Sequence, residues 1–126
     1  MKIEDYFVRV QGLLRRPSIR DTVITFDRRG DSIGFIRGEV YFDDGHVLHL
    51  REYVDVEGGT QKYLYVYHLM NASGAQVFRY DNSGHHNEIS SFPHHRHAAE
   101  DASISACGEP DLGAILDEIE DHLDLV

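Results

Sequence analysis

The sequence is poor in the residues and segments that build disulfides, thiolate metal sites and membrane spans. Its 126 residues include one cysteine, Cys107. An intramolecular disulfide and a metal site made mainly of thiolates are therefore excluded. No stretch approaches the roughly 18 consecutive apolar residues of a membrane-spanning helix. The first residues, Met1 to Asp5, lack the basic and apolar regions of a signal peptide. We expect a cytoplasmic protein without membrane contact.

Positive charge is also scarce, and most of it comes from arginine. Lys and Arg number 12 against 22 Asp and Glu, which gives a formal net charge of -10. This charge does not attract a polyanion overall, so binding of nucleic acid would need a local basic site. The only lysines are Lys2 and Lys62, and arginine suits two-pronged contacts with phosphate. The length, with 41% apolar and 27% charged residues, predicts one globular domain over residues 1–126.

Both ends of the chain have the apolar spacing of amphipathic helices. From Ile3 onward, apolar residues recur at steps of three and four, which predicts a helix to about Arg16, before Pro17. The same spacing over residues 112–123 predicts a second helix, with Asp111 as its N-cap. The domain is therefore expected to begin and end with a helix.

The segment between these helices has short runs rich in Val, Ile, Tyr and Phe, separated by turn residues. This pattern predicts an α+β fold in which an antiparallel meander of about five strands is flanked by the N-terminal and C-terminal helices. The predicted strands are Asp21 to Asp27, Ile33 to Phe42, Val47 to Val56, Gln61 to Met70, and Ala75 to Tyr80. In the fourth strand, Tyr63, Tyr65 and Tyr67 share one face. We predict a core on one face and a wet aromatic surface on the other, where Tyr65 and Tyr67 bind substrate.

Five of the nine histidines fall within residues 85–97, directly after a predicted strand that ends near Arg79 and Asp81. Because side chains alternate along a strand, Arg79 and Asp81 should point to the same side. By the same rule His95 and His97 would share a face if extended, with His94 opposite. The candidate catalytic residues are Arg79, Asp81, His85, His86, His94, His95 and His97. The candidate substrate-binding arginines are Arg37, Arg51 and Arg96.

Three interpretations of this histidine cluster remain open. Two imidazoles can act as general base and acid while an arginine stabilises phosphoryl charge, which would allow RNA cleavage without a metal. Alternatively, imidazoles with Asp81 or Glu88 could bind zinc or another divalent transition metal. The third interpretation is structural, with hydrogen-bonded histidines fixing a long loop. The separate histidines are more easily explained as structural. They are His46, His49, His68 and His122.

Several motifs together resemble the TumE-type toxins of prokaryotic toxin-antitoxin systems. The likeness covers about half the chain and is most specific in Phe78-Arg79-Tyr80-Asp81-Asn82, His85-His86 and Phe92-Pro93-His94-His95-Arg96-His97. Weaker matches are Ile36-Arg37-Gly38, Asp44-Gly45-His46-Val47-Leu48 and the run from Lys62 to His68. The resemblance implies a small toxin with a helix-turn-helix antitoxin partner, and it does not define a biochemical activity. Where the family often has proline around the first histidine pair, this chain has Gly84 and Asn87.

The leading hypothesis is therefore an RNA-cleaving toxin that needs no cofactor. In it, His86 and His95 exchange protons, Asp81 orients one of them, and Arg79 and Arg96 hold phosphate. One alternative is a binding module that acts by occupying a protein or nucleic acid without turnover. Another is a hydrolase with a histidine-bound divalent metal such as zinc. A homodimer is compatible with each of these hypotheses.

Overall fold

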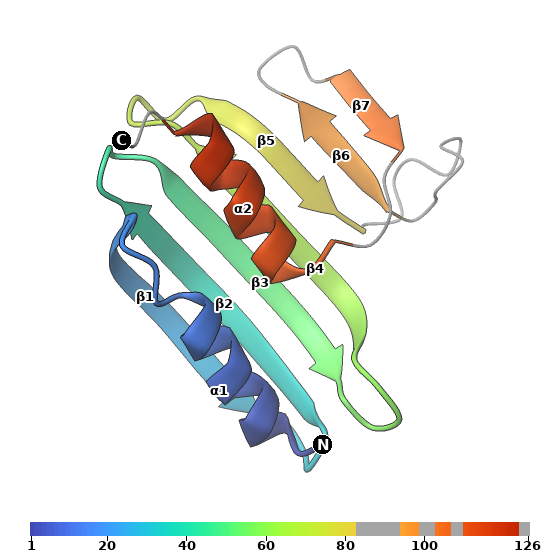
Figure 1. The fold of residues 1–126 in the computed structure, drawn as a ribbon. Helices are drawn as coiled ribbons and strands as arrows, with labels where there is room; N and C mark the ends of the chain where they lie inside the picture. The colour runs from blue at the N-terminus through green and yellow to red at the C-terminus, as the bar shows by residue number, and fades with distance from the viewer. Residues whose placement is uncertain (83–93, 99–102, 107–109, 124–126) are drawn as a thin grey trace.

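Seven antiparallel strands lie side by side in the order in which the chain forms them (Figure 1). The computed structural model describes residues 1–82, 94–98, 103–106 and 110–123. The strands are β1 (Ile19–Arg28), β2 (Ile33–Phe42), β3 (Val47–Asp55), β4 (Gln61–Met70), β5 (Gln76–Asp81), β6 (His95–Ala98) and β7 (Ser103–Ala106). Each strand pairs with its neighbours in sequence, so the sheet is a meander, as the sequence predicts.

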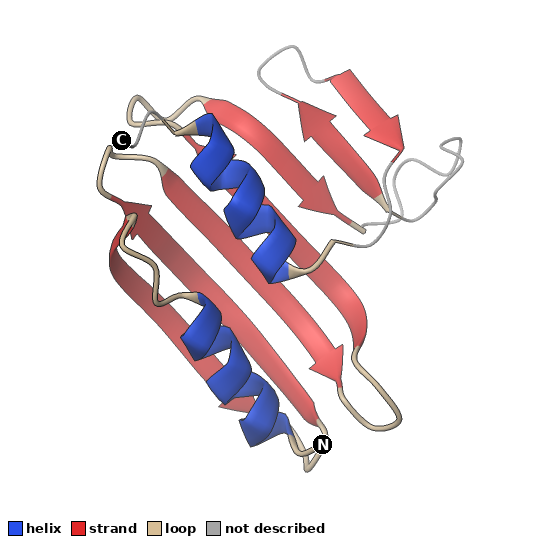
Figure 2. Cartoon of the chain, viewed as in Figure 1, coloured by secondary structure: helices blue, strands red, loops and turns tan. Residues whose placement is uncertain are grey.

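Two helices cover the same face of this sheet (Figure 2). They are α1 (Ile3–Leu13), which lies over the β1 and β2 side, and α2 (Leu112–His122), which lies over the middle of the sheet. We call this side the helix face. No other described helix or strand covers the opposite side, which we call the open face. The predicted α+β architecture, with a helix at each end of a meander, is confirmed.

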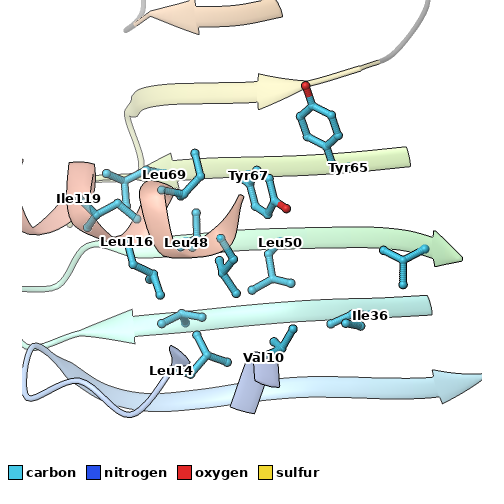
Figure 3. Packing of buried hydrophobic residues seen from close by; sticks show 14 of the residues in the cluster. Val10, Leu14, Ile36, Leu48, Leu50, Tyr65, Tyr67, Leu69, Leu116 and Ile119 are labelled. Carbon is cyan, nitrogen blue, oxygen red and sulfur yellow. The ribbon is translucent and has the colours of Figure 1, made fainter. Parts of the chain in front are cut away.

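The hydrophobic core lies between the helices and the helix face (Figure 3). The labelled core residues are Val10, Leu14, Ile36, Leu48, Leu50, Tyr65, Tyr67, Leu69, Leu116 and Ile119. Burial of each large apolar side chain stabilises the fold by about 1.5–3 kcal/mol. The close approach of α1 depends on Gly34 of β2, because a Cβ there would lie 2.6 Å from both Ile3 and Phe7 side-chain atoms. Because side chains alternate along each strand, one set of residues points into the core and the other set points to the open face.

The helix ends follow local signals that the sequence carries. The Asp111 carboxylate accepts a hydrogen bond of 2.8 Å from the backbone N–H of Ala114, which confirms the predicted N-cap of α2. The first helix ends earlier than predicted: its C-cap is Leu14, whose N–H donates to the Val10 carbonyl at 3.2 Å. Arg16 lies beyond this cap and forms ion pairs with Asp117 and Glu120 of α2. Arg16, which the sequence predicts to end the first helix, instead links the connection between α1 and β1 to α2.

Two short strands, β6 and β7, are not among the five strands that the sequence predicts. Each has four residues, and β6 pairs with β5 through backbone hydrogen bonds. The His95–Ala98 segment has no alternation of apolar and polar residues that would reveal it as a strand. Pairing with an existing strand edge, rather than local pattern, therefore accounts for it. Within the described residues, no helix is long and apolar enough to cross a bilayer.

Candidate functional site

A line of imidazole and charged side chains crosses the open face from β2 to β6. The direct cross-strand partners are Glu39 with His49, His49 with His68, His68 with Arg79, and Arg79 with His97. Directly opposed residues in a sheet point to the same face. We call these five residues the His/Arg row. Each of five consecutive strands therefore contributes one polar side chain to a single line.

The buried carboxylate of Asp81 holds together the β5 and β6 end of this row. One of its oxygens, Oδ2, lies 2.9 Å from Arg79 Nε and 3.2 Å from His97 Nε2. The Asp81 side chain is only 1% exposed, so water screens its charge less than it would screen a carboxylate at the surface. The expectation that Arg79 and Asp81 share a side is confirmed by their contact. The contact between Asp81 and His97 also places His97, from the histidine-rich segment, beside the end of β5.

His68 occupies the position between His49 and Arg79 in the row. Its Nε2 atom is buried and has no hydrogen-bond partner in the described part of the chain. Burial, the nearby Arg79 guanidinium and His49 lower the pKa of His68 from its ordinary value of 6.5. The ring is therefore predominantly neutral at pH 7. In the neutral form, one ring nitrogen carries a lone pair that can accept a proton.

A shallow cavity of about 280 Å³ lies on the open face beside the His/Arg row. Its lining includes Arg37 and Arg51 as well as Glu39 and His49. Arg37 and Arg51 are direct cross-strand partners and both are exposed. Like charges opposite each other destabilise a sheet unless an anion lies between them. Neither guanidinium forms an ion pair with a residue that the structure describes. The cavity therefore presents two parallel cations.

Two other predicted site residues point toward the helix face: Arg96 of β6, and His94, which directly precedes β6. The Nδ1 atom of His94 lies 2.8 Å from the Tyr65 hydroxyl, and the two rings stack with centroids 5.8 Å apart. Arg96 donates to the Tyr80 hydroxyl at 3.1 Å and to Glu118 of α2 at 3.0 Å. The prediction that His94 and His97 point to opposite sides is confirmed. The structure therefore does not bring His94 and Arg96 together with Asp81.

Tyr65 and Tyr67 are fully buried, so the prediction that they form a wet aromatic surface is wrong (Figure 3). Strand alternation was correct in giving them one face, but this is the face that the helices cover. The Tyr67 hydroxyl donates to Glu52 at 2.5 Å, and Tyr6 of α1 donates to the same carboxylate. The Lys62 ammonium donates to the Tyr67 hydroxyl at 2.7 Å. We call Tyr6, Glu52, Lys62 and Tyr67 the buried polar network.

This buried polar network has no counterpart in the sequence predictions. Glu52 is 0% exposed, and burial next to its charge raises the pKa of Tyr67 well above the ordinary value. The Lys62 ammonium also donates to the Pro110 carbonyl at 2.9 Å, just before α2. The network therefore links α1, the sheet and the start of α2. Its groups satisfy one another, as buried polar groups must.

Several predicted residues lie outside what the structure describes. His85, His86 and Glu88 fall within residues 83–93, and for His95 only the backbone is described, as the partner of Asp81. The proposed proton exchange between His86 and His95 stays a prediction. Among the described residues, no group of three or more His, Cys, Asp or Glu side chains is placed to hold a metal ion. The metal alternative therefore stays open for the remaining residues.

His49 and His68 are the members of the row that sequence reasoning set aside as structural. The available signal was the two-residue repeat of a strand. This repeat puts His49 and Arg51 on one face of β3, and Val66 and His68 on one face of β4. Register was the missing information, because it alone places His68 opposite Arg79. A single histidine in a strand acquires its neighbours from other strands.

Comparison with known proteins gives one match, to a protein family. A family model described as Toxin TumE matches residues 9–123. Searches of curated proteins and of solved structures find no match. The matched region begins in α1 and includes the whole sheet and α2. Membership of a toxin family implies an antitoxin partner. The match covers far more than half of the chain, and the chain therefore belongs to the TumE toxin family.

Proposed function

We propose that this toxin cleaves RNA without a metal ion, using His68, Arg79 and His97 on the open face. The supporting observation is the register of β4, β5 and β6, which sets the Arg79 guanidinium between two imidazoles. Two imidazoles can serve as base and acid, and a guanidinium can stabilise the charge of a phosphoryl transition state. These are the groups that cleavage next to a 2'-hydroxyl needs.

In the proposed reaction, neutral His68 removes the proton of the 2'-hydroxyl, and the 2'-oxygen attacks the adjacent phosphorus. The bond between phosphorus and the 5'-oxygen breaks, and His97 donates a proton to that oxygen. The products are a 2',3'-cyclic phosphate and a 5'-hydroxyl, and Arg79 stabilises the negative charge on the phosphoryl oxygens during transfer. The lowered pKa of His68 supports its role as the base.

Asp81 supports the role of His97 as the acid. The carboxylate lies 3.2 Å from Nε2, so it orients the ring and stabilises the imidazolium form. Asp81 is a positioning residue in this scheme, because it acts through His97 and Arg79. Its replacement by Asn should therefore change the pH dependence of cleavage as well as the rate.

The local basic site that an acidic protein needs for RNA is supported by Arg37 and Arg51. Both line the cavity that also contains His49 of the His/Arg row. Phosphate groups bound there would relieve the repulsion between the two guanidinium groups. We also propose that the toxin acts in the cytoplasm and that its antitoxin is a helix-turn-helix protein. The resemblance of the histidine motifs supports that choice of partner.

The test is an RNA cleavage assay with purified protein in chelator. We expect cleavage in chelator, fragments with 2',3'-cyclic phosphate ends, and no cleavage of the matching all-deoxy strand. Absence of cleavage both in chelator and after divalent metal is restored would overturn the proposal. Cleavage that requires metal would replace it with the metal-dependent alternative. RNA binding without turnover would instead favour the binding module.

Variants of the row sharpen this assay. His68→Gln and His97→Gln should each reduce the cleavage rate by about 10²- to 10⁴-fold, the contribution typical of a general acid or base. His122→Gln is the matched control, because His122 ends α2 and contacts the His46 ring, away from the row. Equal rates for His68→Gln and His122→Gln would remove His68 from the mechanism.

A further inference from the structure

The open face carries a second feature, at the end where β2 begins and β3 ends. Phe35 and Tyr53 are direct cross-strand partners, with ring centroids 6.2 Å apart. Tyr63 of β4 lies beside them, with its ring 5.8 Å from that of Tyr53. We call Phe35, Tyr53 and Tyr63 the aromatic platform. Three strands therefore present aromatic rings at one end of the face that carries the His/Arg row.

At the platform an irregularity in strand pairing accompanies the exposure of Tyr63, while Phe35 and Tyr53 are half-buried. The register between β3 and β4 shifts between Tyr53 and Val54, so Tyr63 has no direct partner and lies beside Tyr53. Tyr63 is 52% exposed and Leu64 is 39% exposed, which is unusual for two large consecutive residues of a strand. Exposure of large rings costs free energy, so such a surface commonly has a binding role.

Cations lie at the platform, where Arg29 also pairs with Asp27, and between the platform and the His/Arg row. The Arg29 guanidinium lies over the Phe35 ring at 5.8 Å from its centroid. Along β2 and β3, the next residues on the open face after Phe35 and Tyr53 are Arg37 and Arg51, about 7 Å farther on. The following step reaches His49 and the row. Rings, cations and imidazoles therefore succeed one another in a line along the same strands.

We propose that the aromatic platform binds unstacked bases of single-stranded RNA, while Arg37 and Arg51 bind its phosphates on the way to the His/Arg row. The proposal rests on the function proposed above and names its substrate class. Single strands expose base faces for stacking on aromatic rings, whereas the bases of a duplex are stacked on one another. The adjoining arginines favour phosphates over an acidic or apolar protein segment, because bases and phosphates alternate along RNA as rings and cations do along this face.

Binding can be measured separately from cleavage with the His97→Gln variant. The probe is a fluorescently labelled single-stranded oligouridine of about ten nucleotides, within the range that such surfaces cover. When Tyr63→Ala is combined with His97→Gln, binding of the probe should weaken by about 5- to 150-fold, the loss expected for one stacked base. Tyr63→Phe keeps the ring and should bind as before. A duplex of the same length should bind much more weakly than the single strand.

The matched control is Tyr41→Ala, because Tyr41 lies on the open face of β2 at the far side of the row. It should leave RNA affinity unchanged, and thermal melting verifies that every variant is folded. The inference is overturned if Tyr53→Ala and Tyr63→Ala both leave RNA affinity unchanged, or if duplex binds as tightly as single strand. It is also overturned if these variants weaken only antitoxin binding.

The two proposals fail in different ways. If wild-type protein cleaves RNA but the platform variants bind and cleave normally, the stacking inference fails and the proposed function stands. If the platform variants lose affinity for single strands while wild-type protein never cleaves RNA, the stacking inference stands and the proposed function fails. Affinity and turnover therefore test the substrate class and the chemistry independently.

Discussion

The two faces of the sheet use polar residues for opposite purposes. On the helix face, Glu52 is fully buried and its charge is satisfied by the hydroxyls of Tyr6 and Tyr67. On the open face, Arg37 and Arg51 lie opposite each other without an ion pair among the described residues. Polar groups that stabilise a fold are satisfied within it, whereas groups that bind a ligand remain available. In the proposed function, the helix face therefore serves stability and the open face serves binding and catalysis.

The buried polar network offers the strongest test of this separation. Glu52→Ala removes the acceptor of two buried hydroxyls and leaves Lys62, whose ammonium lies 3.9 Å from the carboxylate, as a buried cation. Breaking a buried pair in this way costs about 3–5 kcal/mol. We expect that loss in the free energy of unfolding measured with urea, compared with Glu57→Ala in an exposed turn. A loss similar to that of Glu57→Ala would contradict the assignment.

His68 should make stability depend on pH to a smaller extent. Its folded pKa is lowered, so the unfolded chain binds a proton more readily than the folded protein does. The contribution of His68 is therefore present above its unfolded pKa of about 6.5 and is lost as pH falls through the folded pKa. The urea midpoint should fall between pH 7 and pH 5 by less in His68→Gln than in wild type. An identical fall in both proteins would show that the His68 ring titrates normally.

Arg51→Gln should have the smallest effect on stability, and its sign should be favourable. The substitution removes the repulsion between two directly opposed cations, which is worth about 0.2–1 kcal/mol in a sheet. The same change removes one proposed phosphate contact, so the dependence of RNA affinity on salt should decrease by about one ion. Unfolding and binding titrations measure the two effects. Reduced stability together with unchanged RNA binding would mean that Arg51 supports the fold instead.

Local patterns predicted most of the secondary structure. The spacing of apolar residues found both helices, and Asp111 was correctly expected to cap α2. Turn residues separated the first five strands. The β6 and β7 strands were not predicted, because each has only four residues and the His95–Ala98 segment lacks alternation of apolar and polar residues. Their strand character depends on the pairing of β6 with β5 and of β7 with β6, which lies outside any local window.

The candidate site was predictable only where its residues are close in sequence. Arg79 and Asp81 are two positions apart, so alternation alone set them on one side, and their ion pair confirms it. The sequence alone favours a structural role for His68, because the residues that lie beside it come from β3 and β5. Tyr65 and Tyr67 were assigned to a wet surface because alternation defines two faces without saying which one the helices cover.

The sequence by itself determined both helices and the first five strands of this toxin, because helix and strand periodicity, capping and turn formation act over a few neighbouring residues. Only the tertiary structure decided which face became core and which residues meet across strands. Both helices pack on one side of the sheet, and that choice buried Glu52 and Tyr67 while leaving Arg37 and Arg51 in solvent. Register then brought His68, Arg79 and His97 into one line, because backbone pairing, unlike periodicity, joins residues that are far apart in the chain.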